Sequence, residues 1–387
     1  GFQDLDYADE GAELFDDIGS VIQTANIVVK TTNFTSQELS LMKEGQTLIS
    51  CVDFNTMTCS DAEIMEKTKT LLFGGSFDPI HDGHVLMAKT AAQALDANQV
   101  VFILARHPRW KTTSATPVDR AKMLECVIIS DLNFQISDIE LKSEDEINYT
   151  YVTVGRYLAL HPNEEVAFLI GSDQANQFDQ WYAAEALAKI CQIVVYERPD
   201  DELNLDLVKQ YNMKVVHGPQ TSASSTNIRR LRDCQTPLTV LSYIARENLY
   251  YMPELHKYLS PKRLAHSLRV ARLAYEIAKA NNVDYGRVYA AALLHDIGKE
   301  MNEEEALAIM KEHFPTELAN LHGNNELYHQ FVGAYLAKTR FKINDEEVLD
   351  AIAYHSSGKE EMNLIGKILY SADKIEPGRK FDSSELI

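Results

Sequence analysis

One stretch, residues 74–84 (GGSFDPIHDGH), constrains the fold more than any other part of the chain. It follows a short apolar run, residues 70–73, that has the pattern of a buried strand, and it leads into residues 85–95, where apolar residues recur at helical spacing. A turn between a strand and a helix lies beside the unpaired N–H groups and the positive dipole end of the helix. Gly74 and Gly75 let the backbone approach a ligand closely. The stretch therefore predicts a phosphate-binding loop.

Two histidines, His81 and His84, stand at positions i and i+3 of this stretch, so we expect both imidazoles on one face of the loop and first helical turn. Imidazoles at a helix N-terminus suit the charge that develops on a phosphoryl group during transfer. The stretch resembles the HxGH signature of nucleotidyltransferases, and its extended form is closest to the nicotinate mononucleotide adenylyltransferases. This resemblance implies catalytic roles for His81 and His84 and substrate binding by Gly74, Gly75, Ser76 and Phe77.

Residues 71–249 alternate between strand and helix patterns, which predicts an α/β, Rossmann-like parallel sheet with ligands at the carboxyl ends of its strands. Further strands are expected at 100–105, 166–170 and 190–196. Asp119 and Arg120 open a helix that we expect to be structural.

Other elements of the same family have counterparts here. In residues 106–111 (RHPRWK), Lys111 matches a catalytic lysine near the phosphates, but Trp110 stands where a histidine is usual; a solvated basic loop is the alternative. Asn148-Tyr149-Thr150 resembles the SYT element beside the pyridine ring, with Asn in place of Ser.

The strand at 166–170 runs into Gly171 and Asp173, which can meet a ribose or a metal, and Trp181 can stack on a flat heterocycle or belong to the core. Residues 221–231 (TSASSTNIRRL) place hydroxyls and a guanidinium before and within a helix, a combination that suits a phosphate. They resemble the second family signature, ISSTxIR, which implies phosphate binding by Ser225, Thr226 and Arg229.

Beyond Tyr250 the pattern becomes uninterrupted helix, which predicts a separate all-α domain. Imidazoles and carboxylates on the buried faces of facing helices can bind a metal. The spacing resembles the HD-domain metallophosphohydrolases, and its details are closest to the symmetrical bis(5′-nucleosyl)-tetraphosphate hydrolases. The resemblance implies one iron or manganese ion on His266, His295, Asp296 and Asp373, with His329 and His355 on a second metal or on substrate phosphate.

Composition restricts the partners. The net charge of −20 argues against general binding to nucleic acid or anionic membrane, no apolar run approaches the roughly 20 residues of a membrane span, and nothing reads as a signal peptide, so we expect a cytoplasmic protein. The five scattered cysteines favour neither a disulfide framework nor a cysteine zinc site.

Residues 1–66 hold 13 acidic and 2 basic residues. Strands are expected at 26–30 and 47–52, and a polar helix at 36–43. The segment resembles part of the N-terminal domain of alanine dehydrogenase and the transhydrogenase alpha subunit. We expect a remnant or a joined reading frame rather than a functional module.

The expected organisation is residues 1–66, a nucleotidyltransferase domain at 67–249, and an HD domain at 250–387 that lacks later helices of its family. The resemblance implies Mg²⁺-dependent adenylyl transfer from ATP to nicotinate mononucleotide, and hydrolysis of a dinucleoside polyphosphate to ADP. Three alternatives stay open: another acceptor such as pantetheine phosphate, another nucleotide for the HD domain such as a guanosine alarmone, and a non-catalytic nucleotide sensor. A homo-oligomer is possible.

Overall fold

The structure is a computed structural model that describes residues 20–22, 27–30, 41, 47–50, 67–106, 112–128, 133–143, 148–197 and 202–378. The chain separates into two compact units, residues 1–66 and 67–387, and each is considered by itself. Within the described ranges, no helix combines the length and apolar character needed to cross a bilayer.

The first unit contains a parallel pair of strands, β1 (Ile27–Lys30) and β2 (Thr47–Ser50), with Ile27 opposite Thr47. Both expected strands are therefore confirmed. The polar helix expected at 36–43 falls almost wholly outside the described residues. The resemblance of this unit to alanine dehydrogenase stays a prediction.

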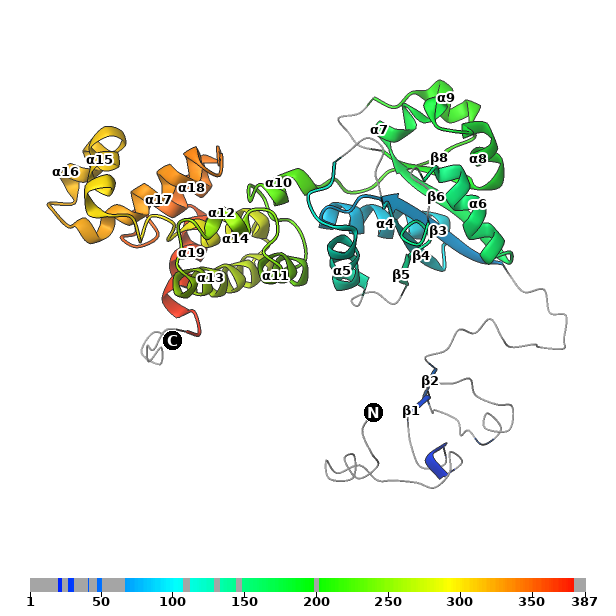
Figure 1. Ribbon diagram of the computed structural model, residues 1–387, viewed down its shortest axis with the longest axis horizontal. Coiled ribbons are helices and arrows are strands. Elements are labelled where there is room, and N and C mark those ends of the chain that lie inside the picture. The colour runs from blue at the N-terminus through cyan, green and yellow to red at the C-terminus, as the bar shows by residue number, and fades with distance from the viewer. Residues whose placement is uncertain are drawn as a thin grey trace. The chain divides into compact units, whose positions relative to one another are not determined.

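The second unit begins with a six-stranded sheet in which every pairing is parallel (Figure 1). We call residues 67–249 the sheet half and residues 250–378 the helical half. The elements of the sheet half are β3 (Thr68–Gly75), α4 (Asp82–Leu95), β4 (Gln99–Leu104), α5 (Pro117–Ile128), β5 (Phe134–Ser137), α6 (Thr150–Leu160), β6 (Glu164–Gly171), α7 (Ser172–Ala175), the 3-10 helix η2 (Phe178–Gln180), α8 (Ala184–Ile190), β7 (Gln192–Tyr196), α9 (Leu205–Gln210), β8 (Lys214–Val216), α10 (Ser225–Arg229) and α11 (Leu238–Arg246).

The strand order β5-β4-β3-β6-β7-β8 places a topological switch point between β3 and β6. The chain builds outward from β3 to β5 and then returns to the other side of β3. In open parallel sheets, ligands bind in the crevice at the carboxyl ends of the strands where the order reverses. The loop after β3 and the turn after β6 both lie at that crevice.

Helices cover both faces of the sheet, which is why its strands read as continuous apolar runs. Leu71 and Phe73 of β3 belong to the core beneath α4 and α5. Leu72, which lies between them, belongs to the core that includes residues of α6 and α8 on the opposite face. Figure 1 shows these two helical layers on either side of the strands.

Some details differ from the sequence-based expectation. The edge strand β5 (FQIS) and helix α6 (TYVTVGRYLAL) were not anticipated, because β5 has only four residues and α6 is rich in β-branched and aromatic side chains. The strand expected from Ile190 begins at Gln192, since Ile190 ends α8. Helix α10 ends at Arg229, and Leu231 then adopts a left-handed φ of 54°.

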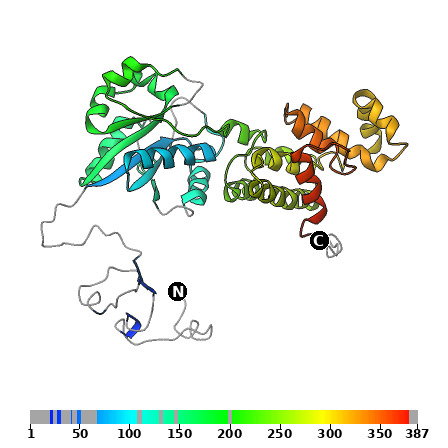
Figure 2. The ribbon, with the colours of Figure 1, turned by 180° about the vertical axis from the view of Figure 1, so that it is seen from behind.

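The described part of the helical half contains no strand, as the sequence predicted. Its elements are α12 (Met252–Leu255), α13 (Pro261–Ala280), α14 (Tyr285–Leu294), α15 (Glu303–His313), α16 (Pro315–Asn320), the 3-10 helix η3 (Asn325–Leu327), α17 (Tyr328–Thr339), α18 (Glu346–Ala353) and α19 (Leu364–Ile375). Five of these helices begin at a capping side chain that accepts first-turn N–H groups: Ser260, Asp284, Asn302, Asp345 and Asn363. Helices α13, α14 and α19 pack side by side (Figures 1 and 2).

One apolar core runs through both halves of the second unit. It joins Leu71 and Phe102 of the sheet to Leu241 of α11 and to Ala291 and Leu369 of the helical half. The two halves therefore share a continuous buried contact.

Candidate functional sites

The first candidate site is the loop between β3 and α4. His81 is the N-cap of α4, with an extended φ of −149°, and it is buried. The rings of His81 and His84 stack with their centroids 3.7 Å apart, and the backbone N–H of His81 donates to Nδ1 of His84 at 3.3 Å. The structure thus brings both imidazoles together at the first turn of a helix, beside the switch point of the sheet.

Gly83 is required by the packing of this histidine pair. A Cβ at residue 83 would lie 3.0 Å from the ring of His81 and 3.0 Å from Cγ2 of Thr221. The glycine between the two histidines therefore makes room for His81 and for the segment that precedes α10.

Gly74 and Gly75 also make room for aromatic rings. A Cβ at Gly74 would lie 3.0 Å from the ring of Phe168, and one at Gly75 would lie 2.8 Å from the ring of Phe77. Phe77 is only 1% exposed, has a left-handed φ of 43°, and packs against His84. Its side chain belongs to the core, so any contribution of Phe77 to ligand binding comes from its backbone.

Helix α10 holds the loop between β3 and α4 in place through side-chain hydrogen bonds. The hydroxyl of Ser225 donates to the carbonyl of Pro79 at 2.9 Å. The guanidinium of Arg229 donates to the carbonyl of Asp78 and, at 3.1 Å, to the hydroxyl of Thr226. The two signatures, about 150 residues apart in sequence, therefore meet in one site.

Arg120 connects this loop to the one that follows β4. It is fully buried, and it donates to the carbonyl of Ser76 at 2.7 Å and to that of Ala105 at 2.8 Å. Burial lowers the pKa of Arg120, while the carboxylate of Asp78 favours its charged form. The sequence indicated a structural helix here, and the structure shows the specific structural task of Arg120.

The remaining predicted residues of the sheet half lie at the same edge or outside the described ranges. Gly171 ends β6, and Asp173 follows it in α7, where it accepts a hydrogen bond from the amide of Gln174 at 3.4 Å. Lys111 and Trp110 fall among residues that the structure does not describe.

The aromatic residues near this edge form two groups. Tyr149, the N-cap of α6 before Thr150, has its ring centroid 4.4 Å from that of Tyr182, which is 55% exposed. Trp181 is half-buried, with its ring centroid 5.2 Å from that of Phe178. Trp181 thus has a core contact as well as an accessible surface.

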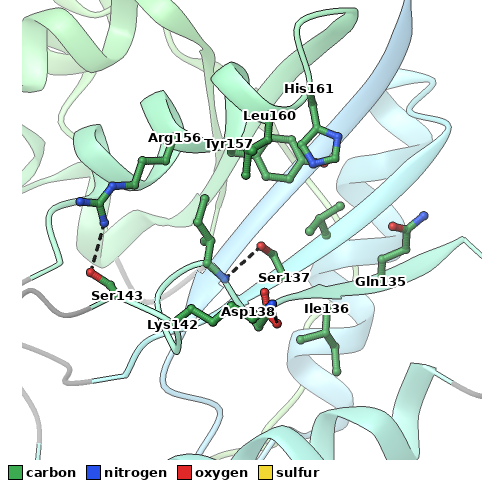
Figure 3. A pocket seen from close by; sticks show the side chains of 12 residues that line it. Gln135, Ile136, Ser137, Asp138, Lys142, Ser143, Arg156, Tyr157, Leu160 and His161 are labelled. Atoms are coloured by element: carbon green, nitrogen blue, oxygen red, sulfur yellow. Dashed lines mark hydrogen bonds and ion pairs between the residues drawn. The ribbon is translucent and has the colours of Figure 1, made fainter. Parts of the chain in front are cut away.

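A hollow of about 730 Å³ lies beside β5 and α6 and is separate from the histidine loop (Figure 3). Its basic side chains already have partners. Lys142 pairs with Asp138 at 2.7 Å, and His161 pairs with Glu164 at 3.1 Å. None of the residues predicted from the sequence lines this hollow, and its paired charges do not favour a phosphate site.

The second candidate site gathers four histidines and two aspartates from five places in the helical half. The six residues are His266 on α13, His295 and Asp296 at the end of α14, His329 on α17, His355 after α18, and Asp373 on α19. All lie in positions that the sequence indicated, and all except His266 are at least nine-tenths buried.

Asp296 lies at the centre of this cluster. Asp296 belongs to two groups of possible ligands, one with His266 and His295 and one with His329 and His355. Within each group, the ligand atoms all lie within 4.8 Å of one another. Oδ1 of Asp296 is 3.7 Å from Nε2 of His329 and 3.6 Å from Nε2 of His355. Asp373 adds a carboxylate 3.1 Å from Nε2 of His266 and 3.8 Å from Nε2 of His295.

The tautomers of these histidines follow from their outer contacts. Nδ1 of His295 lies 2.6 Å from the carbonyl of Ala292, Nδ1 of His355 lies 2.8 Å from that of Ile352, and Nδ1 of His329 lies 2.7 Å from that of Glu326. A carbonyl only accepts, so Nδ1 carries the proton in His295 and His355, and the Nε2 lone pair of each ring is available. Nδ1 of His329 lies between its carbonyl and the ammonium of Lys299, 3.2 Å away.

His266 has a carboxylate at each ring nitrogen, because its Nε2 lies 3.1 Å from Oδ1 of Asp373 and its Nδ1 lies 3.1 Å from Oε1 of Glu376. The hydrogen bond with Asp373 raises the pKa of His266, so a metal at this site would take the place of the proton on Nε2.

The electrostatics of the cluster also suit a metal. Burial lowers the pKa of His295 to about 4 and that of His329 to about 3, so both imidazoles are neutral at pH 7. Burial alone would raise the pKa of Asp296, but His295, His355 and Arg263 bring it well below its usual range. Nε2 of His295 is buried without a hydrogen-bond partner, which is the environment of an atom that binds a cation.

Close backbone packing holds the two groups together. A Cβ at Gly298 would lie 2.5 Å from the carbonyl oxygen of His329 and 2.8 Å from the backbone nitrogen of Gly333. Buried Gln330 accepts from the backbone N–H groups of Ser356 and Ser357, both at 3.2 Å. These contacts fix His329 and His355 relative to Asp296.

Three residues near this cluster were not identified from the sequence. Arg263 donates to Oδ2 of Asp296 at 2.8 Å, and exposed Lys299 has its Nζ 3.2 Å from Nδ1 of His329. The carboxylate of Glu376 lies beside Nδ1 of His266 and orients its ring. Both Arg263 and Lys299 could have been found from their spacing in the sequence. Arg263 precedes His266 by three residues on one helix, and Lys299 ends residues 295–299 (HDIGK), which begin with His295 and Asp296.

Two family models match the chain, one in each half of the second unit. Residues 72–231 match the family model described as cytidylyltransferase-like, and residues 263–378 match the HD domain model. A Mycoplasma genitalium protein named probable nicotinate-nucleotide adenylyltransferase/Ap4A hydrolase is 33% identical over 316 residues, which cover 81% of this chain and 89% of that protein.

Two further relatives each match one half. A probable nicotinate-nucleotide adenylyltransferase of Geobacillus kaustophilus is 35% identical, over 46% of this chain and 84% of that protein. The symmetrical bis(5′-nucleosyl)-tetraphosphatase of Bacillus subtilis is 40% identical, over 32% of this chain and 66% of that protein.

Proposed function

The chain belongs to the family of nicotinate-nucleotide adenylyltransferase/Ap4A hydrolases, and on this basis we propose that it carries out both reactions. The sheet half transfers the adenylyl group of ATP to nicotinate mononucleotide, and the helical half hydrolyses diadenosine tetraphosphate to ADP. The observation that carries the proposal is the presence of two built sites on one chain: the stacked His81–His84 pair at the switch point of the sheet, and the buried histidine–aspartate cluster.

In adenylyl transfer, a phosphate oxygen of the mononucleotide attacks the α-phosphorus of ATP. The bond from that phosphorus to the bridging oxygen breaks, and pyrophosphate leaves. His81 and His84 stabilise the negative charge that develops on the transferring phosphoryl group. Arg229, Ser225 and Thr226 hold the phosphates together with the N-terminus of α4. No protein nucleophile is needed, because the acceptor phosphate itself attacks.

The acceptor occupies the edge formed by the carboxyl ends of β4, β3 and β6. Tyr149 and Trp181 provide aromatic surfaces for the pyridine ring, and Asp173 lies at the end of β6 within reach of a ribose. Mg²⁺ accompanies the triphosphate of ATP, and Lys111 adds a positive charge.

In the helical half, His266, His295, Asp296 and Asp373 would hold one divalent metal, and His329 and His355 would hold a second metal or the substrate phosphate. Imidazole nitrogens and carboxylates suit several transition metals, and the resemblance to the HD-domain hydrolases favours iron or manganese among them. A bound metal of this kind supplies Lewis-acid activation of a water and of a phosphoryl oxygen. Arg263 and Lys299 neutralise charge on the tetraphosphate. Attack of water on one of the two central phosphorus atoms breaks its bond to the oxygen that joins it to the other central phosphorus, and this gives two ADP.

The test is turnover of the purified chain. Pyrophosphate release from ATP should depend on nicotinate mononucleotide and should be much slower with pantetheine phosphate as acceptor. Metal-dependent hydrolysis of diadenosine tetraphosphate should give ADP as the sole nucleotide product. A chain that binds both nucleotides without turning either over would be a sensor, and the proposal would fail. We propose that these reactions occur in the cytoplasm.

A further inference from the structure

Asp82, which directly follows His81 and begins α4, accepts a hydrogen bond from a residue of the helical half. The hydroxyl of Tyr285, the first residue of α14, donates to Oδ2 of Asp82. The two residues are 203 positions apart in the sequence. Burial raises the pKa of Asp82, and the hydrogen bond from Tyr285 offsets part of that cost by favouring the carboxylate.

The backbone on both sides of His81 is held by the segment that precedes α11. The N–H of Asp82 donates to the carbonyl of Gln235 at 3.1 Å, and the hydroxyl of Thr236 donates to the carbonyl of Ile80 at 2.8 Å. This segment in turn contacts the helical half, because the hydroxyl of Tyr275 on α13 donates to the carbonyl of Thr236 at 3.3 Å.

The N-terminus of α14 is itself rigidly placed. Asp284 caps it by accepting the N–H groups of Gly286 and Arg287, both at 3.1 Å. A Cβ at Gly286 would fall against Oδ1 of Asp233 and 2.6 Å from the backbone nitrogen of Gln235. The helix start therefore lies in direct backbone contact with the segment that holds the loop, and Tyr285 has little freedom to move away from Asp82.

We propose that Tyr285 is a positioning residue for adenylyl transfer, supplied to the sheet half by the helical half. It fixes Asp82 and thereby the first turn of α4, from which His81 and His84 extend. Displacement of reacting groups by about 1 Å commonly costs roughly 10²-fold in rate, so a tether at this turn acts on the chemical step rather than on substrate affinity. This inference rests on the proposed transferase function and adds a residue that lies outside the match to the cytidylyltransferase-like model, which ends at residue 231.

The test compares Tyr285→Phe with Tyr289→Phe in the full chain. Tyr289 lies one turn further along α14, is buried at 2% exposure, and has its hydroxyl near Tyr251 rather than the loop. Tyr285→Phe should lower kcat of adenylyl transfer roughly tenfold with KM for both substrates within about twofold. Tyr289→Phe should leave kcat within about twofold, and both variants should hydrolyse diadenosine tetraphosphate at the wild-type rate.

Asp82→Ala provides the second arm, because it removes the acceptor from the loop side. It should reproduce the loss in kcat, and adding Tyr285→Phe to it should cost no more than about twofold further. An unchanged kcat in Tyr285→Phe, an equal loss in Tyr289→Phe, or additive losses with Asp82→Ala would each overturn the inference while the wild type stays active. A wild-type chain without adenylyl transfer would instead overturn the proposed function on which the inference rests.

Discussion

Replacing Gly298 by alanine should disable the hydrolase site without touching a ligand. The new Cβ would lie 2.5 Å from the carbonyl oxygen of His329 and 2.8 Å from the nitrogen of Gly333, and both are backbone atoms that cannot rotate aside. Ordinary contacts need about 3.5 Å, so α17 must move by roughly 1 Å relative to the HDIGK segment. Such overpacking costs about 1–3 kcal/mol.

The same movement separates His329 from Asp296, whose Nε2 and Oδ1 atoms now lie 3.7 Å apart. Metal ligands tolerate displacements of only about 0.2 Å. We therefore expect Gly298→Ala to lose roughly tenfold or more in affinity for the metal shared by Asp296, His329 and His355, and to hydrolyse diadenosine tetraphosphate at least tenfold more slowly. Adenylyl transfer should stay within about twofold.

The assay measures metal per chain after dialysis against a fixed free metal concentration, with both activities determined on the same preparation. Gly155→Ala is the matched control, because a Cβ at Gly155 in α6 meets nothing within 4 Å. A Gly298→Ala variant with wild-type metal content and hydrolysis would refute the link between this backbone contact and the metal site.

Two further predictions concern the sheet half: the ring contact of Trp181 and the titration of Asp233. Trp181→Ala should raise KM for nicotinate mononucleotide several-fold more than KM for ATP, because stacking on a ring contributes roughly 1 kcal/mol to ground-state binding; equal changes would make Trp181 a residue of the core around Phe178. Burial and the neighbouring carboxylate of Asp284 raise the pKa of Asp233 from 3.8 to about 6, so the folded state keeps a proton that the unfolded state releases, and stability falls as pH rises from about 4 through about 6. Asp233→Asn should remove this decline and stabilise the protein at pH 7 by at most about 3 kcal/mol. Melting curves that shift by the same amount at pH 4 and pH 7 would contradict this origin.

The sequence was sufficient for the fold class, which depends on local pattern, and its resemblance to known families indicated residues that the structure brings together at the two candidate sites. Residues 74–84 contain both histidines together with the strand and helix that position them, and HDIGK carries two adjacent ligands. Short elements, and helices rich in β-branched or aromatic side chains, were harder to predict from the sequence. Strand β5 has only four residues, so its periodicity carries too little information.

Residues that act through distant partners could not be found in this way. Glu376 supports His266 from 110 positions away, and Tyr285 reaches Asp82 across 203 positions. Their functions depend on how α13, α14 and α19 pack, which spacing alone does not encode. Phe77 illustrates the opposite case, since it stands within the signature but its side chain is buried in the core.

The central claim is that one chain carries two independent chemistries, and crossed substitutions test it most directly. Both activities and the metal content should be measured for the wild type, His84→Ala and Asp296→Asn. The account predicts that His84→Ala loses roughly 10²-fold in adenylyl transfer and keeps hydrolysis within about twofold, whereas Asp296→Asn loses its metal and hydrolysis and keeps adenylyl transfer within about twofold. If either folded variant loses both activities together, or if Asp296→Asn still binds metal and hydrolyses diadenosine tetraphosphate, the account is contradicted.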